Sequence, residues 1–123
     1  MDTSKHQLAM ALAELLRSKG AEDIVLLHVS ELSDYTDYLL IATGSSTTTV
    51  RALSQYAIEW AQQHKQQVLG REGMEQPEWI LLDFGSIVLH LFLPEARQFY
   101  AIESLWLDAP RLALPSPTRT GVR

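Results

Sequence analysis

The chain has 123 residues, 46% of them hydrophobic, which is the length of one domain that buries about two-thirds of its unfolded surface. It contains no cysteine, which excludes disulfides, thiolate metal sites and cysteine nucleophiles. The formal net charge of −5 argues against binding of DNA, or of nucleic acid in general, through a broad positive field. No apolar run approaches the roughly 20 residues that cross a membrane, and no secretory signal is recognisable, so we expect a cytoplasmic protein.

Helical spacing marks the first element of the chain. Ser4-x-x-Gln7 fits a capping box ahead of a helix that reaches about Lys19. Its predicted apolar face consists of Leu8, Ala11, Leu12, Leu15 and Leu16. The β-branched and aliphatic run Ile24–Val29 predicts a strand, and the polar residues 30–36 predict a connecting loop.

The next segment, Tyr38–Thr43, is almost wholly apolar and predicts a strand that is buried on both faces. Gly44 ends this strand, and Ser45, Ser46 or Thr47 can cap the helix that follows. We expect that helix to reach about Gln67, with an apolar face formed by Val50, Leu53, Ala57, Trp60 and Ala61. Residues 70–78, with two glycines and a proline, predict a loop.

Two further strands, Trp79–Asp83 and Ile87–Leu93, flank a short turn and predict a hairpin. If Gly85-Ser86 is a two-residue loop, Trp79 faces Phe92 and Leu81 faces His90, whereas a three-residue loop would change this pairing. Because strand side chains alternate between faces, the first register places on one face Trp79, Leu81, Asp83, His90 and Phe92.

Pro94 begins a predicted third helix, in which Phe99, Ile102 and Trp106 share an apolar face. A polar stripe, Arg97-x-x-Tyr100-x-x-Glu103, is offset from that face and is typical of a solvated or salt-bridged surface. Residues 111–123 contain three arginines and two prolines without an acidic residue, so we expect a flexible Pro/Arg-containing tail after a domain at 1–110.

The element order is helix, two strands, helix, two strands, helix. This order predicts a single α/β (α+β) domain with a mixed β-sheet and about three helices. So few helices can cover one face of the sheet and leave the hairpin side chains as an exposed aromatic patch. The alternative is that a helix covers these side chains and that His90 is a hydrogen-bonded core residue.

Motifs of common enzymes are missing from the chain. There is no P-loop and no nucleophile elbow, and the four histidines are scattered, so we expect no catalytic residue, cofactor or metal. Gly44-Ser45 is typical of a turn that starts a helix, but nucleotidyltransferases carry Gly-Ser at a similar turn. Those enzymes also need paired carboxylates on a following strand, where this chain offers Asp83 alone.

Several motifs follow one another in an order that resembles the ribosomal silencing factor family, also called RsfS or Iojap. They cover residues 8–110 and comprise Asp37, Gly44-Ser45, Glu72-Gly73, Trp79-x-x-x-Asp83-x-Gly85, His90 and Arg97-x-x-Tyr100-x-x-Glu103-x-Leu105-Trp106. The resemblance implies a nucleotidyltransferase-like topology without catalysis. It also implies a supporting structural role for Asp37, Gly44, Arg97, Tyr100, Glu103 and Trp106.

The same resemblance implies a translation repressor that binds the large ribosomal subunit through large-subunit protein fourteen and sterically blocks the small subunit. Trp79, Leu81 and Phe92 would be the apolar anchors of this contact. Asp83 and His90 would add specificity for a basic partner, and a histidine can titrate near neutral pH. The alternatives are a nucleotidyltransferase-like enzyme with a degenerate metal site, or a self-associating domain that forms a homodimer when free.

Overall fold

The structure, a computed structural model, describes residues 3–114. The helical elements are α1 (Thr3–Ser18), α2 (Thr47–Gln63), α3 (Pro94–Tyr100) and the 3-10 helix η1 (Ile102–Trp106). The strands are β1 (Glu22–His28), β2 (Tyr38–Thr43), β3 (Gly70–Glu72), β4 (Trp79–Asp83) and β5 (Ile87–Phe92). This arrangement confirms the predicted single α+β domain with three α-helices and a mixed sheet. No described helix has the length and apolar character needed to span a bilayer.

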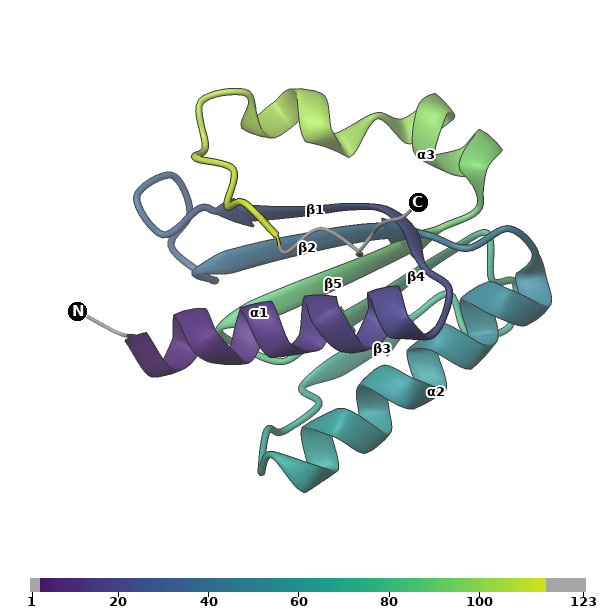
Figure 1. Cartoon of the computed structure of the whole chain (residues 1–123). Coiled ribbons are helices and arrows are strands. Elements are labelled where there is room, and N and C mark those ends of the chain that lie inside the picture. The colour runs from purple at the N-terminus through teal and green to yellow at the C-terminus, as the bar shows by residue number, and fades with distance from the viewer. Residues whose placement is uncertain (1–2, 115–123) are drawn as a thin grey trace, which may run out of the picture.

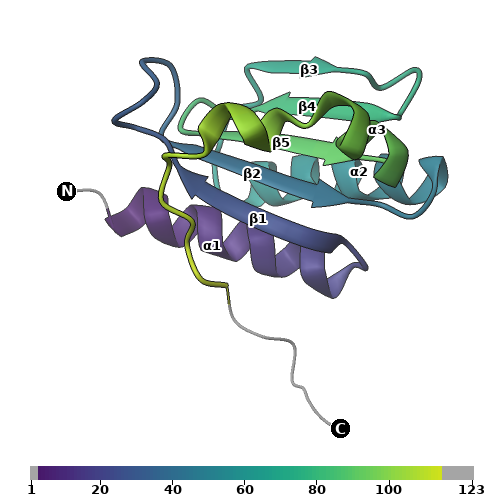
Figure 2. The same ribbon diagram turned by 90° about the horizontal axis from the view of Figure 1, so that it is seen from above.

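The five strands form one sheet in the order β1-β2-β5-β4-β3. Strands β2 and β5 are parallel, and the other neighbouring pairs are antiparallel. Helices α1 and α2 lie on one face of the sheet, and α3 with η1 lies on the other (Figures 1 and 2). The domain therefore has three layers, with a separate apolar cluster on each side of the sheet.

The two central strands, β2 and β5, are buried along their whole length. Leu40 and Ala42 pack beneath α1 and α2, whereas Leu39 and Ile41 belong to the cluster on the opposite face. This alternation is the normal pleat of a strand that is covered on both sides. The prediction that Tyr38–Thr43 is buried on both faces is confirmed.

The face of the sheet opposite α1 and α2, here called the second face, is more enclosed than the sequence indicated. The third helix is broken, and the part after the break packs on this face. Ala101 adopts a left-handed conformation (φ 47°, ψ 46°), and its N–H donates to the Arg97 carbonyl, as at a helix C-terminus. The prediction of one continuous helix is therefore wrong. Ile102 and Trp106 pack on the sheet, whereas Phe99, predicted to share their face, is 81% exposed.

The hairpin forms in the predicted register. Trp79 lies opposite Phe92 and Leu81 opposite His90, and the Phe84 N–H donates to the Ile87 carbonyl at 2.9 Å. These contacts confirm the two-residue loop Gly85-Ser86.

A short strand, β3, lies within the segment predicted to be a loop and pairs with β4. Gly73, which follows β3, has a φ of 85°, and a Cβ atom there would lie 2.0 Å from the Trp79 carbonyl oxygen. Only glycine fits this turn, which brings β3 back beside β4.

The chain after η1 returns to the free edge of β1. The His28 N–H donates to the Pro110 carbonyl, the Leu112 N–H donates to the Leu26 carbonyl, and both distances are 2.9 Å. Leu112 and Leu114 also pack against the apolar cluster between the sheet and helices α1 and α2. The first four residues of the segment predicted to be a flexible tail are therefore part of the folded domain, while residues 115–123 lie outside the described residues.

Two truncations test this assignment. A chain that ends at Pro110 should have a free energy of unfolding about 2 kcal/mol lower than one that ends at Leu114, because it loses two partly buried leucines and one backbone hydrogen bond. The comparison isolates residues 111–114 and can be made by urea denaturation. Equal stabilities would show that these residues contribute nothing to the domain.

Candidate functional site

The five side chains predicted to share a sheet face, here called the hairpin face, do lie together on β4 and β5, but at different depths. Phe92 has no exposed surface and His90 is only 7% exposed, whereas the members on β4 are partly exposed. The helical segment formed by α3 and η1 covers the middle of the sheet, as Figure 2 shows. The expectation that Phe92 and His90 are exposed is therefore wrong, and the surface open to a partner is formed by Trp79, Leu81 and Asp83.

Trp79 is the most tightly held of the exposed members of the hairpin face. Its indole Nε1 donates to His90 Nδ1 at 2.9 Å. Its ring stacks on Phe92, with centroids 5.0 Å apart, and meets Tyr100 of α3 at 4.6 Å. Three neighbours thus fix the indole in one orientation, which reduces the entropy that a partner would have to remove on binding.

His90 is the residue that orients this indole. Burial of its imidazole lowers its pKa from 6.5 to about 4, so the ring is neutral at neutral pH and Nδ1 can accept the hydrogen bond from Trp79. Burial therefore moves the pKa of His90 away from the neutral range in which a histidine can titrate. The alternative reading of His90 as a hydrogen-bonded core residue is confirmed.

Two aspartates stabilise loops at the ends of strands. Asp83 Oδ1 accepts a hydrogen bond from the Gly85 N–H at 2.8 Å, which fixes the hairpin turn. Asp37 accepts from Lys5 Nζ at 3.1 Å and so links the start of β2 to α1. Asp37 thus orients its loop, and Asp83 fixes the turn at the end of the hairpin face.

Gly44 is needed where β2 meets α2. A Cβ atom at this position would lie 2.8 Å from Val50 Cγ2 and 3.0 Å from the Val50 backbone nitrogen, so any side chain would push the helix away. Ser46 caps α2, because its Oγ accepts from the Thr49 N–H at 3.1 Å. The Gly44-Ser45 turn is therefore a helix start, as its sequence indicates.

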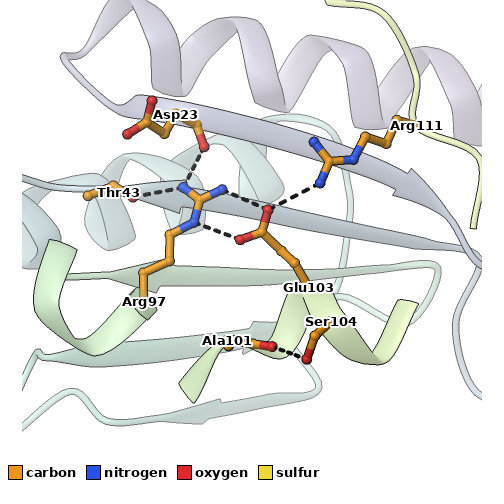
Figure 3. Close-up of polar contacts among 7 residues, drawn as sticks. All are labelled: Asp23, Thr43, Arg97, Ala101, Glu103, Ser104 and Arg111. Carbon is orange, nitrogen blue, oxygen red and sulfur yellow. Dashed lines mark hydrogen bonds and ion pairs between the residues drawn. The ribbon is translucent and has the colours of Figure 1, made fainter. Parts of the chain in front are cut away.

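Of the two forms expected for the polar stripe on the third helix, solvated or salt-bridged, the structure shows the salt-bridged one. Arg97 Nε and Nη2 donate to the two carboxylate oxygens of Glu103 at 3.0 and 3.2 Å, and Nη1 donates to Thr43 Oγ1 at 2.8 Å and to the Asp23 carbonyl (Figure 3). The Arg97 side chain is only 13% exposed. This guanidinium therefore joins α3, η1 and the ends of β1 and β2.

The other motif residues of this region also support the second face. Tyr100 packs on Trp79, while Trp106 packs in the cluster under η1. Glu103 lies 3.6 Å from Arg111 as well, so the C-terminal segment joins the same ion-pair network (Figure 3).

The site offers groups for binding. Within residues 3–114, no three His, Cys, Asp or Glu side chains lie close enough together to hold a metal ion. What the hairpin face presents is a fixed indole, a partly exposed leucine and one carboxylate. Such a mixture of apolar area and a few polar groups is typical of a protein-binding surface.

The depressed pKa of His90 predicts that stability depends on pH. Between pH 6.5 and 4 the unfolded chain binds a proton that the folded chain does not, so the free energy of unfolding should fall as the pH falls, by about 3 kcal/mol once the pH is below 4. Replacing His90→Gln removes the titrating group and should flatten this dependence. Urea denaturation at several pH values measures both, and identical pH profiles would contradict the assignment.

The family model described as "Ribosomal silencing factor during starvation" matches residues 2–122 of this chain. The ribosomal silencing factor RsfS of Halalkalibacterium halodurans is 33% identical over 111 residues, which cover 90% of this chain and 95% of the relative. The mouse protein named "Mitochondrial assembly of ribosomal large subunit protein 1" is 38% identical over 77% of this chain, a stretch that spans 43% of the mouse protein.

Solved structures agree with this relationship. A crystal structure of a protein from Bacillus halodurans superposes with a TM-score of 0.75 at 33% identity and covers 89% of this chain and 96% of its own. One from Chromobacterium violaceum gives 0.78 at 29% identity, over 94% and 93%. The family model and the close relatives agree along nearly the whole chain. The chain therefore belongs to the ribosomal silencing factor family, a family of regulators of the ribosome.

Proposed function

We propose that this protein represses translation in the cytoplasm by binding the large ribosomal subunit through the hairpin face. The observation that carries the proposal is the indole of Trp79, which is held partly exposed by His90, Phe92 and Tyr100. A fixed aromatic side chain at a surface is typical of a binding hot spot. The relatives named as ribosomal silencing factors support the ribosome as the target.

The partner within the large subunit is large-subunit protein fourteen, as the family resemblance implies. A basic ribosomal protein suits a chain with a net charge of −5 better than bare RNA does, because phosphates would be repelled. Asp83, at the end of the hairpin face, supplies a carboxylate for such a partner. Silencing then follows from steric exclusion of the small subunit, and the protein needs no catalysis or cofactor.

Self-association is a competing use of the same surface. Trp79 and Leu81 can pack against a second copy when no ribosome is present, so a free homodimer and the ribosome-bound protein would be mutually exclusive. Dimerisation would then lower the concentration of binding-competent protein without altering the binding site.

Sedimentation with purified subunits tests the function directly. The protein should sediment with large subunits, not with small ones, and should lower the yield of joined ribosomes when added before the small subunit. Equal sedimentation with both subunits, or with neither, would refute silencing by this route.

Two adjacent leucines test the binding surface. Leu81 lies on the hairpin face and is partly exposed, whereas Leu82 points to the opposite cluster and has no exposed surface. Leu81→Ala should weaken large-subunit binding about tenfold with a small change in melting temperature. Leu82→Ala should destabilise the fold by about 2–5 kcal/mol, while the folded fraction still binds normally.

The pair separates folding from recognition because both variants remove the same atoms from neighbouring positions. Binding is measured by sedimentation at a temperature where both variants are folded, as checked by circular dichroism. Unchanged binding by Leu81→Ala would place the contact elsewhere on the protein.

A further inference from the structure

A groove of about 500 Å³ lies beside the hairpin face. Its lining consists of Glu78, Leu93, Glu95, Ala96, Phe99 and Tyr100. Tyr100 forms a shared wall, because the same ring meets the indole of Trp79 at 4.6 Å. A partner that covers Trp79 would therefore reach the groove as well.

The groove contains two aromatic rings that the fold leaves in solvent. Phe99 is 81% exposed and Tyr100 is 48% exposed. The two rings meet edge to face, with centroids 5.0 Å apart and an angle of 89° between their planes. Phe99 belongs to α3, whereas Ile102 lies beyond the break at Ala101, and only Ile102 packs on the sheet.

The rim of the groove carries uncompensated negative charge. Glu78 and Glu95 are exposed, and neither forms an ion pair within the described part of the chain. The cation of the same helix, Arg97, is engaged by Glu103 on the other side of α3. The groove thus combines apolar and aromatic walls with two free carboxylates.

We propose that this groove receives an arginine side chain of the protein that covers the hairpin face. A guanidinium has flat, weakly hydrated faces that stack on aromatic rings and N–H groups around its edge that bond carboxylates. Those two properties match Phe99 and Tyr100 on the walls and Glu78 and Glu95 on the rim. The proposal rests on the proposed function, since it names a contact of the same partner.

The negative charge of the rim favours an arginine side chain over other groups that an apolar groove could bind. Phosphate groups of RNA or of a lipid surface would be repelled by the two carboxylates. A second copy of this chain has a net charge of −5, so it is a poorer source of a cation for the rim than a basic protein is. A basic protein segment satisfies both the rings and the rim.

The groove can be tested without the ribosome. N-acetyl-arginine methylamide, titrated at millimolar concentration, should shift the NMR signals of the Phe99 and Tyr100 rings, whereas N-acetyl-norleucine methylamide should not. Glu78→Gln/Glu95→Gln, which removes both carboxylates and keeps their shape, should reduce the arginine effect at least fivefold. Equal shifts with the two amides, or none with either, would overturn the proposal.

Large subunits provide the second measurement. Glu78→Gln/Glu95→Gln should bind them at least tenfold more weakly at low salt, and the difference should shrink as salt screens the contact. The matched control is Glu31→Gln/Glu59→Gln, which changes the net charge equally at exposed positions away from the groove and should bind normally. Equal losses in both double variants would show a general charge effect and overturn the proposal.

The two measurements also distinguish this proposal from the proposed function. If the unaltered protein does not bind large subunits, the proposed function fails and the amide titration alone decides whether the groove takes arginine. If large subunits bind but the groove variants behave like the control, the function stands and the groove assignment falls.

Discussion

The ion pair between Arg97 and Glu103 spans the break in the third helix, and the architecture of the second sheet face depends on it. Because the guanidinium is largely removed from water, it needs every partner it has, and those partners come from η1, the end of β2 and the start of β1. Together they hold Ala101 in a left-handed conformation that alanine adopts only under tertiary constraint. The fixed break places η1 over the sheet, so His90 and Phe92 become core while Trp79 at the flank remains open.

Much of the fold could be predicted from the sequence, because the apolar residues follow the helix and strand periods closely. Periodicity located the main strands, the long helices and the hairpin register. The break at Ala101 could not be predicted, since alanine is the best helix former and neither glycine nor proline marks the position. The strand β3 was missed because three residues are too short for a period. Both features arise from contacts between distant parts of the chain.

The candidate site was predicted in the same partial way. The alternation of strand side chains correctly placed five residues on one face, because that property is local. Their depth depends on which element covers them, and the covering element was the one misread. The same error placed Phe99 on one apolar face with Ile102 and Trp106 and concealed the groove beside Trp79. An apolar residue that the sequence places on a packed face but the structure exposes, such as Phe99, thus indicates a candidate binding surface.

The closure of the β1 edge has a consequence for how the chain is made. Residues 110–112, which pair with β1, come after all the helices and strands in the sequence. The edge of β1 therefore stays open until synthesis of the domain is nearly complete. An open edge presents unpaired N–H and C=O groups that can recruit a strand from another chain. The opposite edge, β3, has only three residues and is a poor template. Once made, residues 110–112 cover an edge of the sheet that could otherwise pair with a strand from another chain.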